Sequence, residues 1–367
     1  MADSRYEVVI VGAGIAGIAT AFYLVTRYGR RSVLLIDSRE PMSYTSAQSG
    51  DNYRNWWPHP TMAAFTNDSI DELDRLALES DNVFHMTRGG YALATRHDVS
   101  GFVQTIAGDI DVHLTEGKSA VAKRFPAFSD EIANVIHIRR GGDISGQQLG
   151  AWMLDRVRAG GGRRIVGDVR SINENGGYDI EFVTSEGIRK VSGDAVVNAA
   201  GPFVNNIAAM LGQTLPVKNV FQQKIAFEDT RGAIPRDMPF SIDLDAKTLQ
   251  WSADEIELLR EDDEHAWLTE EIQGGTHCRP EGGLNGGWVK LGWAYNQTPS
   301  EPQQDLADEP SIDPQFPEIV IRGAAAFLPK LQQYIEAPPT RFAHYGGYYT
   351  MTGENWPIIG PLDDRAA

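Results

Sequence analysis

The chain has 367 residues, of which 42% are hydrophobic, and a formal net charge of −17 at pH 7. This length and composition suffice for two domains or one large α/β unit, and the negative charge argues against nucleic acid or an anionic membrane as a partner. The single cysteine, Cys278, excludes an intrachain disulfide framework and is expected to be an inert strand residue. We expect neither a leader nor a transmembrane segment, and therefore a cytoplasmic protein.

The start of the chain is predicted to form a strand, a tight turn and a helix. Val8 to Val11 is a short β-branched run typical of a buried strand, and apolar residues recur at helical spacing from Ile15 to Phe22. The glycines between them have the spacing G-x-G-x-x-G, which permits a sharp turn, a close approach of pyrophosphate to the backbone and close helix packing. The helix N-terminus also favours phosphate. The candidate residues for binding an adenine dinucleotide are Gly12, Gly14, Ile15, Ala16 and Gly17.

An acidic residue follows the next predicted strand, Ser32 to Ile36. Asp37 lies about twenty residues past Gly17, the distance at which a carboxylate accepts hydrogen bonds from a ribose 2′-hydroxyl. This acid selects against a 2′-phosphate. Ser38 and Arg39 come directly after it and are counted with the cofactor-binding residues. The motif alone leaves both NAD and FAD open.

The polar loop after Asp37 carries hydroxyls, small residues and an arginine where a NAD-binding dehydrogenase normally continues into a strand. This loop resembles that of the FAD-dependent amine oxidoreductases of the D-amino acid oxidase and sarcosine oxidase superfamily, which runs beside the pyrophosphate and the flavin. The residues that match are Ser46, Ser49, Gly50 and Arg54. The resemblance implies FAD. We expect non-covalent FAD, because the loop has no histidine and Gly347 stands where the sarcosine oxidase branch has its cysteine.

Later stretches carry the same resemblance, which covers the whole chain. Asp194 to Phe203 resembles the family's VVNAAGPW strand and turn, in which Ala200 and Gly201 let the cofactor approach the backbone. Tyr345 to Pro361 resembles the segment that returns the family's chain to the flavin domain. Val169 matches a valine whose backbone lies against the adenine.

The implied fold class is α/β, with a Rossmann-like FAD-binding domain and an α+β substrate domain built on an antiparallel sheet. Val83 to Ala94 is predicted to form paired strands around a turn. The family continues past the last motif with a strand, a Gly-rich loop and a helix, so we expect a C-terminal part of the FAD domain to be absent and supplied by a second polypeptide, because its absence exposes the domain's core. The sequence leaves the oligomeric state undecided. The predicted ranges are 1–80, 146–215 and 342–367 for the FAD-binding domain, and 81–145 and 216–341 for the substrate domain.

The catalytic residues are harder to predict, because the cofactor carries the chemistry. By resemblance, the reaction is hydride transfer from a carbon bearing nitrogen to flavin N5, which gives an imine. A substrate carboxylate favours a bidentate arginine, for which Arg54 and Arg279 compete. Lys290 matches the lysine that lies near N5 in the sarcosine oxidase branch, Tyr348 offers a hydroxyl, and Lys224 is a further polar candidate. The histidines show no metal-ligand spacing, so no metal is predicted.

We predict an enzyme that oxidises the C–N bond of an amino acid or N-substituted amino acid, a small-molecule substrate, with oxygen or another acceptor reoxidising the flavin. The alternatives are an FAD-dependent 2-hydroxy acid dehydrogenase on the same fold and a flavin subunit of a multi-subunit complex. Peroxide formation with amines would support the first, and dye-only turnover with hydroxy acids the second. An absence of turnover without a partner chain would support the third.

Overall fold

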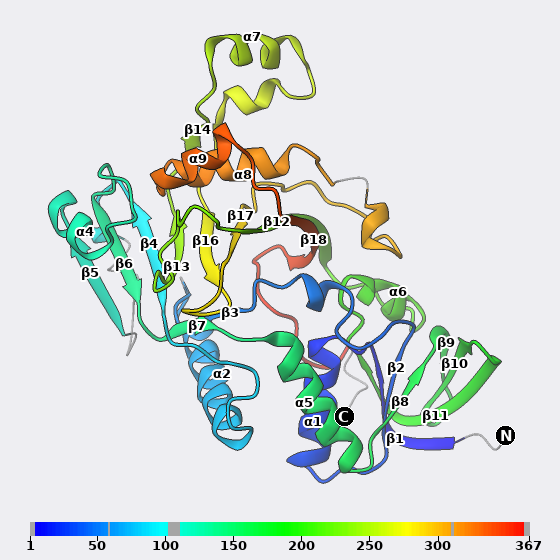
Figure 1. The fold of residues 1–367 in the computed structure, drawn as a ribbon. Helices are drawn as coiled ribbons and strands as arrows, with labels where there is room; N and C mark the ends of the chain where they lie inside the picture. Colours follow the sequence, from blue (N-terminus) through cyan, green and yellow to red (C-terminus); the bar gives the residue numbers. More distant parts are fainter. Residues whose placement is uncertain (1–3, 58, 102–110, 310–311, 363–367) are drawn as a thin grey trace.

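The computed structural model describes residues 4–57, 59–101, 111–309 and 312–362, and two large sheets form its framework (Figure 1). In Figure 1 the first sheet lies on the right and the second at the upper left. Segments that are far apart in the sequence alternate between the two sheets, so each is discontinuous along the chain. This is the arrangement expected of a nucleotide-binding domain with an inserted substrate domain.

The first sheet contains the predicted dinucleotide turn. Within the described residues its strand order is β8-β2-β1-β11-β10-β9. The first four strands run parallel, whereas β10 and β9 continue the sheet in antiparallel fashion. The carboxyl ends of β1 and β2 therefore lie side by side, where open α/β sheets bind nucleotides. The strands are β1 (Ser4–Val11), β2 (Val33–Asp37), β8 (Arg163–Val166), β9 (Asp168–Glu174), β10 (Tyr178–Thr184) and β11 (Gly187–Asn198).

Two helices pack together against this sheet, α1 (Ile15–Thr26) and α5 (Gly146–Ala159) (Figure 1). Their apolar residues recur at helical spacing and form one buried cluster, in which Phe22 and Met153 meet Ile10 of β1. Burial of one such side chain contributes about 1.5–3 kcal/mol. The predicted strand–turn–helix unit is confirmed, and its helix is held in place by α5.

The second sheet is larger. Within the described part of the chain its order is β18-β12-β17-β16-β13-β4-β6-β5, and all neighbours are antiparallel except β13 and β4. The predicted antiparallel sheet is therefore present, with one parallel pair in it. The strands are β4 (Tyr91–Thr95), β5 (Val112–Glu116), β6 (Asn134–Ile138), β12 (Val217–Glu228), β13 (Phe240–Asp243), β16 (Thr276–Glu281), β17 (Trp288–Gly292) and β18 (Phe342–Thr352).

The two faces of the second sheet differ in chemistry. Side chains alternate between the faces along each strand. Ile225 of β12 and Leu291 of β17 belong to the buried cluster packed on α8 (Phe316–Ala325). Their neighbours Lys224 and Lys290 belong to the opposite face, which we call the open face. A polar surface is therefore built on a sheet whose other side is a hydrophobic core.

Shorter elements connect and cover these sheets. In Figure 1, α7 projects from the top of the molecule, away from both sheets. Across the described ranges, no helix is both long and apolar enough to cross a membrane. The remaining elements are η1 (Thr45–Gln48), β3 (Asn52–Arg54), α2 (Pro60–Glu79), α4 (Lys118–Arg124), β7 (Gly141–Asp143), η2 (Gly201–Phe203), α6 (Val204–Ala209), β14 (Lys247–Thr248), α7 (Ala253–Glu261), η3 (Ala266–Thr269), β15 (Glu271–Ile272), η4 (Leu306–Asp308), η5 (Pro329–Leu331) and α9 (Gln332–Glu336).

The structure differs from the sequence prediction in two places, before β4 and at β18. The strand pair predicted over Val83 to Ala94 is a single strand, β4, because Asn82 and His85 have φ values of 52° and turn the chain before it can extend. The segment from Phe342 to Thr352, predicted as part of the FAD-binding domain, pairs along its whole length with β12 and so belongs to the second sheet. We therefore propose a domain boundary after Thr352.

Candidate active site

The turn between β1 and α1 needs its glycines for steric reasons. Gly12 has a φ of 112°, and a Cβ at this position would lie 2.3 Å from the carbonyl oxygen of Ala199. A Cβ at Gly17 would lie 2.0 Å from the carbonyl oxygen of Gly12. Gly14 is the N-cap of α1 and has no side chain to occupy the helix N-terminus. The absence of side chains at these glycines lets the chain turn tightly and leaves only main-chain atoms of the turn facing a ligand in front of the helix.

The acidic residue lies at the same edge. Asp37 Oδ2 accepts a hydrogen bond from the Ala13 N–H at 2.6 Å, and Oδ1 accepts one from the Arg39 N–H at 2.8 Å. The Ile15 N–H, at the start of α1, donates to Ser46 Oγ of η1 at 3.1 Å. These contacts bring the glycine turn, the end of β2 and the predicted loop together.

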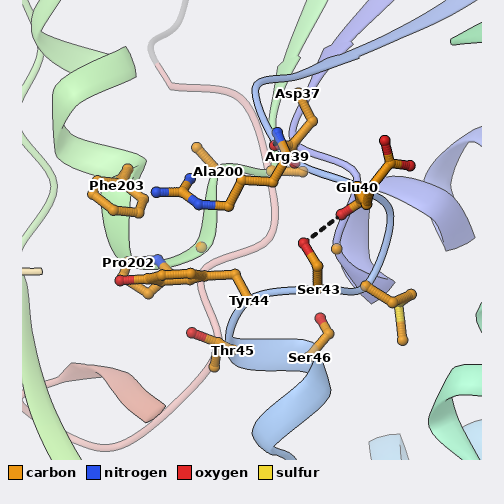
Figure 2. Close-up of a pocket in the computed structure, with 15 residues that line it drawn as sticks. Asp37, Arg39, Glu40, Ser43, Tyr44, Thr45, Ser46, Ala200, Pro202 and Phe203 are labelled. Atoms are coloured by element: carbon orange, nitrogen blue, oxygen red, sulfur yellow. Dashed lines mark hydrogen bonds between the residues drawn. The ribbon is translucent and has the colours of Figure 1, made fainter. Parts of the chain in front are cut away.

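Two adjoining depressions lie over this turn, and Figure 2 shows the first. Ser46 lines the first, whereas Ser38 and Val169 line the second. The two depressions share Gly12, Asp37, Arg39, Ala200 and Phe203. Because they share these residues, the two depressions adjoin one another over the glycine turn.

The residues present fit FAD. Thr45, which lines the first depression, has a buried Oγ1 without a hydrogen-bond partner in the described residues. Gly201 has a φ of 56°, and no atom of the described residues lies within 4 Å of the place that a Cβ would occupy, so the chain leaves free space at the end of β11. The glycine turn and the helix N-terminus are suited to the pyrophosphate, and Asp37 to a ribose.

The predicted loop residues Ser49 and Gly50 lie beyond the two depressions. Ser49 Oγ accepts a hydrogen bond from the Asp51 N–H at 2.9 Å. A Cβ at Gly50 would lie 3.9 Å from Lys224 Cε. Lys224 Nζ in turn donates to the main-chain oxygen of Gln48 at 3.2 Å. The loop after η1 therefore joins the dinucleotide site to the open face of the second sheet.

The open face carries a compact ionic network. Arg279 is 4% exposed, and its guanidinium contacts Asp143 Oδ1 at 3.2 Å and Glu281 Oε1 at 2.5 Å. Lys290 Nζ contacts the same Glu281 oxygen at 2.8 Å. Burial raises the pKa of Glu281, but the two cations outweigh burial and the net pKa is lowered. Two predicted catalytic residues, Arg279 and Lys290, are therefore already paired with carboxylates.

Arg54 is placed differently. It ends β3, and its guanidinium carbon lies 4.7 Å from the ring centroid of Trp57 and 5.2 Å from that of Tyr91. Within the described ranges no carboxylate lies within ion-pair distance of it. Burial raises the pKa of Tyr91 to about 12, so this neighbour stays neutral and does not balance the guanidinium. Of the two competing arginines, Arg54 is therefore the one whose guanidinium is not paired with a carboxylate of the described residues.

Lys224 is the second available cation. It is 6% exposed, and in the described part of the chain it forms no ion pair. Burial lowers its pKa to about 8, against a weaker opposing effect of Asp51. Its register partners are Gly292 on β17 and Tyr345 on β18. The sequence placed Lys224 only among general polar candidates, because its position depends on the pairing of three strands.

Tyr348 lies apart from this network. It is 1% exposed, its hydroxyl contacts the carboxylate of Glu309, and its ring is stacked on Tyr44. Strand alternation assigns Tyr345 and Tyr349 to the open face instead. Lys224 Nζ lies 5.6 Å from the Tyr349 ring centroid. We therefore do not assign Tyr348 a role in contact with substrate.

Cys278 is fully buried in the core of the second sheet, and burial raises the pKa of its thiol well above the usual value. It is a structural residue. In the described residues, no group of three or more His, Cys, Asp or Glu side chains is arranged to hold a metal ion.

The glycine turn and the acid after β2 define a dinucleotide-binding protein, and the adjoining polar sheet fits a flavin-dependent oxidoreductase. A sequence profile of the family described as FAD dependent oxidoreductase, DAO, matches residues 7–366. The chain belongs to this family, and its cofactor is FAD.

Individual relatives are more distant. The chain is 28% identical over 253 residues to the uncharacterized oxidoreductase YurR of Bacillus subtilis (strain 168), a match that covers 63% of this chain and 65%, just under two thirds, of that protein. Glycine oxidase from Geobacillus kaustophilus has a TM-score of 0.74 at 16% identity, with 99% of this chain and 87% of that chain covered. L-proline dehydrogenase from P. horikoshii has a TM-score of 0.75 at 18% identity, with 98% and 86% covered. These two structures share the fold.

Proposed function

We propose that this protein oxidises the C–N bond of an amino acid or N-substituted amino acid, and that Arg54 binds the carboxylate of the substrate. The observation that carries the proposal is the available guanidinium of Arg54, on the small β3-β7 sheet beside the open face, in contrast to the paired Arg279. An arginine fork matches a carboxylate with two parallel hydrogen bonds. The fold shared with an amino acid oxidase and an amino acid dehydrogenase supports the same substrate class.

The charge balance of the open face also supports an anionic substrate. Its cations are Arg54, Lys224, Arg279 and Lys290, and its carboxylates are Asp51, Asp143 and Glu281. With Lys224 protonated, as it is after accepting the substrate's proton, one positive charge is left over. An amino acid with a neutral amine has a single negative charge and balances it, whereas a cationic amine without a carboxylate is repelled. Since an amine must be neutral to be oxidised, this surface favours the reactive form.

Lys224 is the residue that we assign to proton transfer. The substrate's ammonium group loses a proton from its nitrogen, and the neutral form of Lys224 accepts it at Nζ. The pKa of about 8 leaves a minor neutral fraction of Lys224 at neutral pH. Bound FAD then supplies the two-electron acceptor for the oxidation. The protein residues orient the carboxylate, remove the proton and exclude water, and we propose that FAD is held non-covalently.

The proposal is tested by mixing the purified protein with candidate substrates without oxygen and following the visible flavin absorption. Amino acids and N-methylated amino acids are expected to bleach it, and the matching 2-hydroxy acids are not. Bleaching by the hydroxy acids alone would contradict the proposal. Admission of oxygen or of a dye afterwards identifies the electron acceptor, and release of colour into the supernatant after acid precipitation tests the non-covalent binding.

The role of Arg54 is tested in the same assay. Arg54→Met is expected to raise KM by about 10- to 100-fold, because a charge-assisted bidentate contact is lost. Arg88→Met is the matched control, because Arg88 is an exposed arginine paired with Asp74 on α2. Equal effects of the two substitutions would contradict the assignment of Arg54.

A further inference from the structure

A segment from the substrate domain lies across the edge of the dinucleotide site. We call residues 299–309 the strap. Pro299 forms an isolated bridge to β12, and the Ser300 N–H donates to the main-chain oxygen of Asn219 at 2.9 Å. The start of the strap is therefore fixed to the second sheet. Further along, Gln304 lines the second of the two depressions, among residues of the first sheet.

The strap holds Arg39 through Gln304. Arg39 Nη2 donates to the main-chain oxygen of Gln304 at 2.8 Å and to its side-chain Oε1 at 2.9 Å. The guanidinium carbon lies 4.5 Å from the ring centroid of Tyr44 and 5.1 Å from that of Phe203, and Figure 2 shows the Arg39 side chain extended between these residues. Since Arg39 lines both depressions, the strap fixes a cation at their boundary.

The neighbouring glutamine provides a natural comparison. The main-chain oxygen of Gln303 accepts a hydrogen bond from the Tyr44 hydroxyl, and its N–H donates to the Tyr348 hydroxyl at 2.8 Å. The Gln303 side chain instead donates to the main-chain oxygen of Glu301 at 3.2 Å, within the strap. Of these two glutamine side chains, that of Gln304 is the one that reaches Arg39, although both main chains contact residues of the cofactor site.

We propose that the strap is part of the FAD-binding site, with Gln304 as a positioning residue that holds Arg39 toward the negatively charged dinucleotide. A guanidinium tied on one side and stacked between two rings keeps a fixed orientation, so less conformational entropy is lost when an anion binds. Retention of FAD thereby depends on a segment that the substrate domain contributes. This inference concerns the cofactor and is independent of the substrate proposed above.

The test is the rate and equilibrium of FAD release from the holoprotein, followed by the flavin fluorescence that appears on dilution. Gln304→Ala is expected to weaken FAD binding roughly tenfold through faster dissociation, because one hydrogen bond to a charged group is lost. Gln303→Ala is expected to release FAD as the unsubstituted protein does, because among the described residues the Gln303 side chain bonds only to Glu301 of the strap. An unchanged dissociation rate in Gln304→Ala would overturn the proposal.

A double-mutant comparison shows whether Gln304 acts through Arg39. In the Arg39→Met background, Gln304→Ala is expected to cause no further loss of FAD affinity, because the partner of its side chain is already absent. If Gln304→Ala weakens FAD binding in the Arg39→Met background as much as it does in the unsubstituted protein, the positioning role is overturned. An equal loss in Gln303→Ala and Gln304→Ala would also overturn it, since that result indicates general loosening of the strap.

Discussion

The dinucleotide site and the open face are built in opposite ways. The dinucleotide site depends on the main chain, because the glycines at the end of β1 leave no space for a Cβ and Asp37 is held by backbone N–H groups. The open face depends on side chains from β3, β7, β12, β16 and β17, whose charges nearly cancel. The first site tolerates little change because of steric contacts, whereas for the second we propose that single charges decide substrate specificity.

The steric design predicts the largest effect. Gly12→Val is expected to destabilise the protein by about 4 kcal/mol or more and to abolish FAD binding, because the new side chain meets the carbonyl oxygen of Ala199 in a backbone conformation with positive φ. Flavin content and urea unfolding measure this. Gly89→Ala is the control, since none of the described atoms lies within 4 Å of a Cβ there. Normal flavin content in Gly12→Val would contradict the steric requirement for glycine at position 12.

The electrostatic design predicts a smaller loss of stability on the open face. Glu281→Gln is expected to lower the free energy of unfolding by about 2–4 kcal/mol, because Arg279 and Lys290 lose a shared carboxylate in a buried setting. Asp143→Asn, at a side chain that is 36% exposed, is expected to lower the free energy of unfolding by a smaller amount. Urea unfolding of both variants measures this, and an equal loss of stability in the two would contradict the prediction.

The pH dependence of stability sharpens the comparison further. The pKa of Lys224 is lowered by burial from 10.5 to about 8 in the folded protein, so between these values the unfolded chain binds more protons. Stability is therefore expected to rise by about 2–3 kcal/mol as the pH increases from about 8 to 10.5. Lys290 is also shifted downward by burial, and Asp51, His277 and Tyr345 interact electrostatically within the same network.

The contribution of Lys224 is isolated by difference. In Lys224→Met the rise in stability over this range is expected to be smaller than in the unsubstituted protein, as measured by unfolding at a series of pH values. An identical rise in both proteins would show that Lys224 is not the group with the lowered pKa.

The smallest expected effect concerns the thiol. Cys278 is fully buried and its pKa is raised, so a thiol reagent is expected to leave the native protein unlabelled and its activity unchanged. Labelling is expected only after unfolding. Rapid labelling of the native protein would show that the second sheet opens at β16.

The same contrast explains how much of the fold and of the candidate site could be predicted from the sequence. The glycine spacing and Asp37 are local features, because the turn, the strand and the helix are formed by neighbouring residues, and the structure confirms these elements. The open face was only partly predictable. The pairing of Arg279 with Asp143 depends on how β16 meets β7, which no local pattern indicates, although Glu281 lies only two residues further along β16.

Strand register accounts for the other differences. Tyr348 and Tyr349 are adjacent in sequence, yet alternation puts them on opposite faces of β18, and a shift of one residue exchanges their roles. The position of Lys224 beside the ionic network depends on its pairing with Gly292 of β17 and Tyr345 of β18, which the sequence does not indicate. The Gln304 contact with Arg39 joins residues 265 positions apart, and no local pattern indicates it.

The most direct test of the account is the binding of a carboxylate that has no oxidisable C–N bond, such as propionate, followed by the perturbation of the visible flavin spectrum. We predict a saturable change in the unsubstituted protein and in Arg88→Met. In Arg54→Met the dissociation constant is expected to rise about tenfold or more, because we propose that the guanidinium of Arg54 binds the carboxylate. The same dissociation constant in Arg54→Met and in the unsubstituted protein would contradict the account.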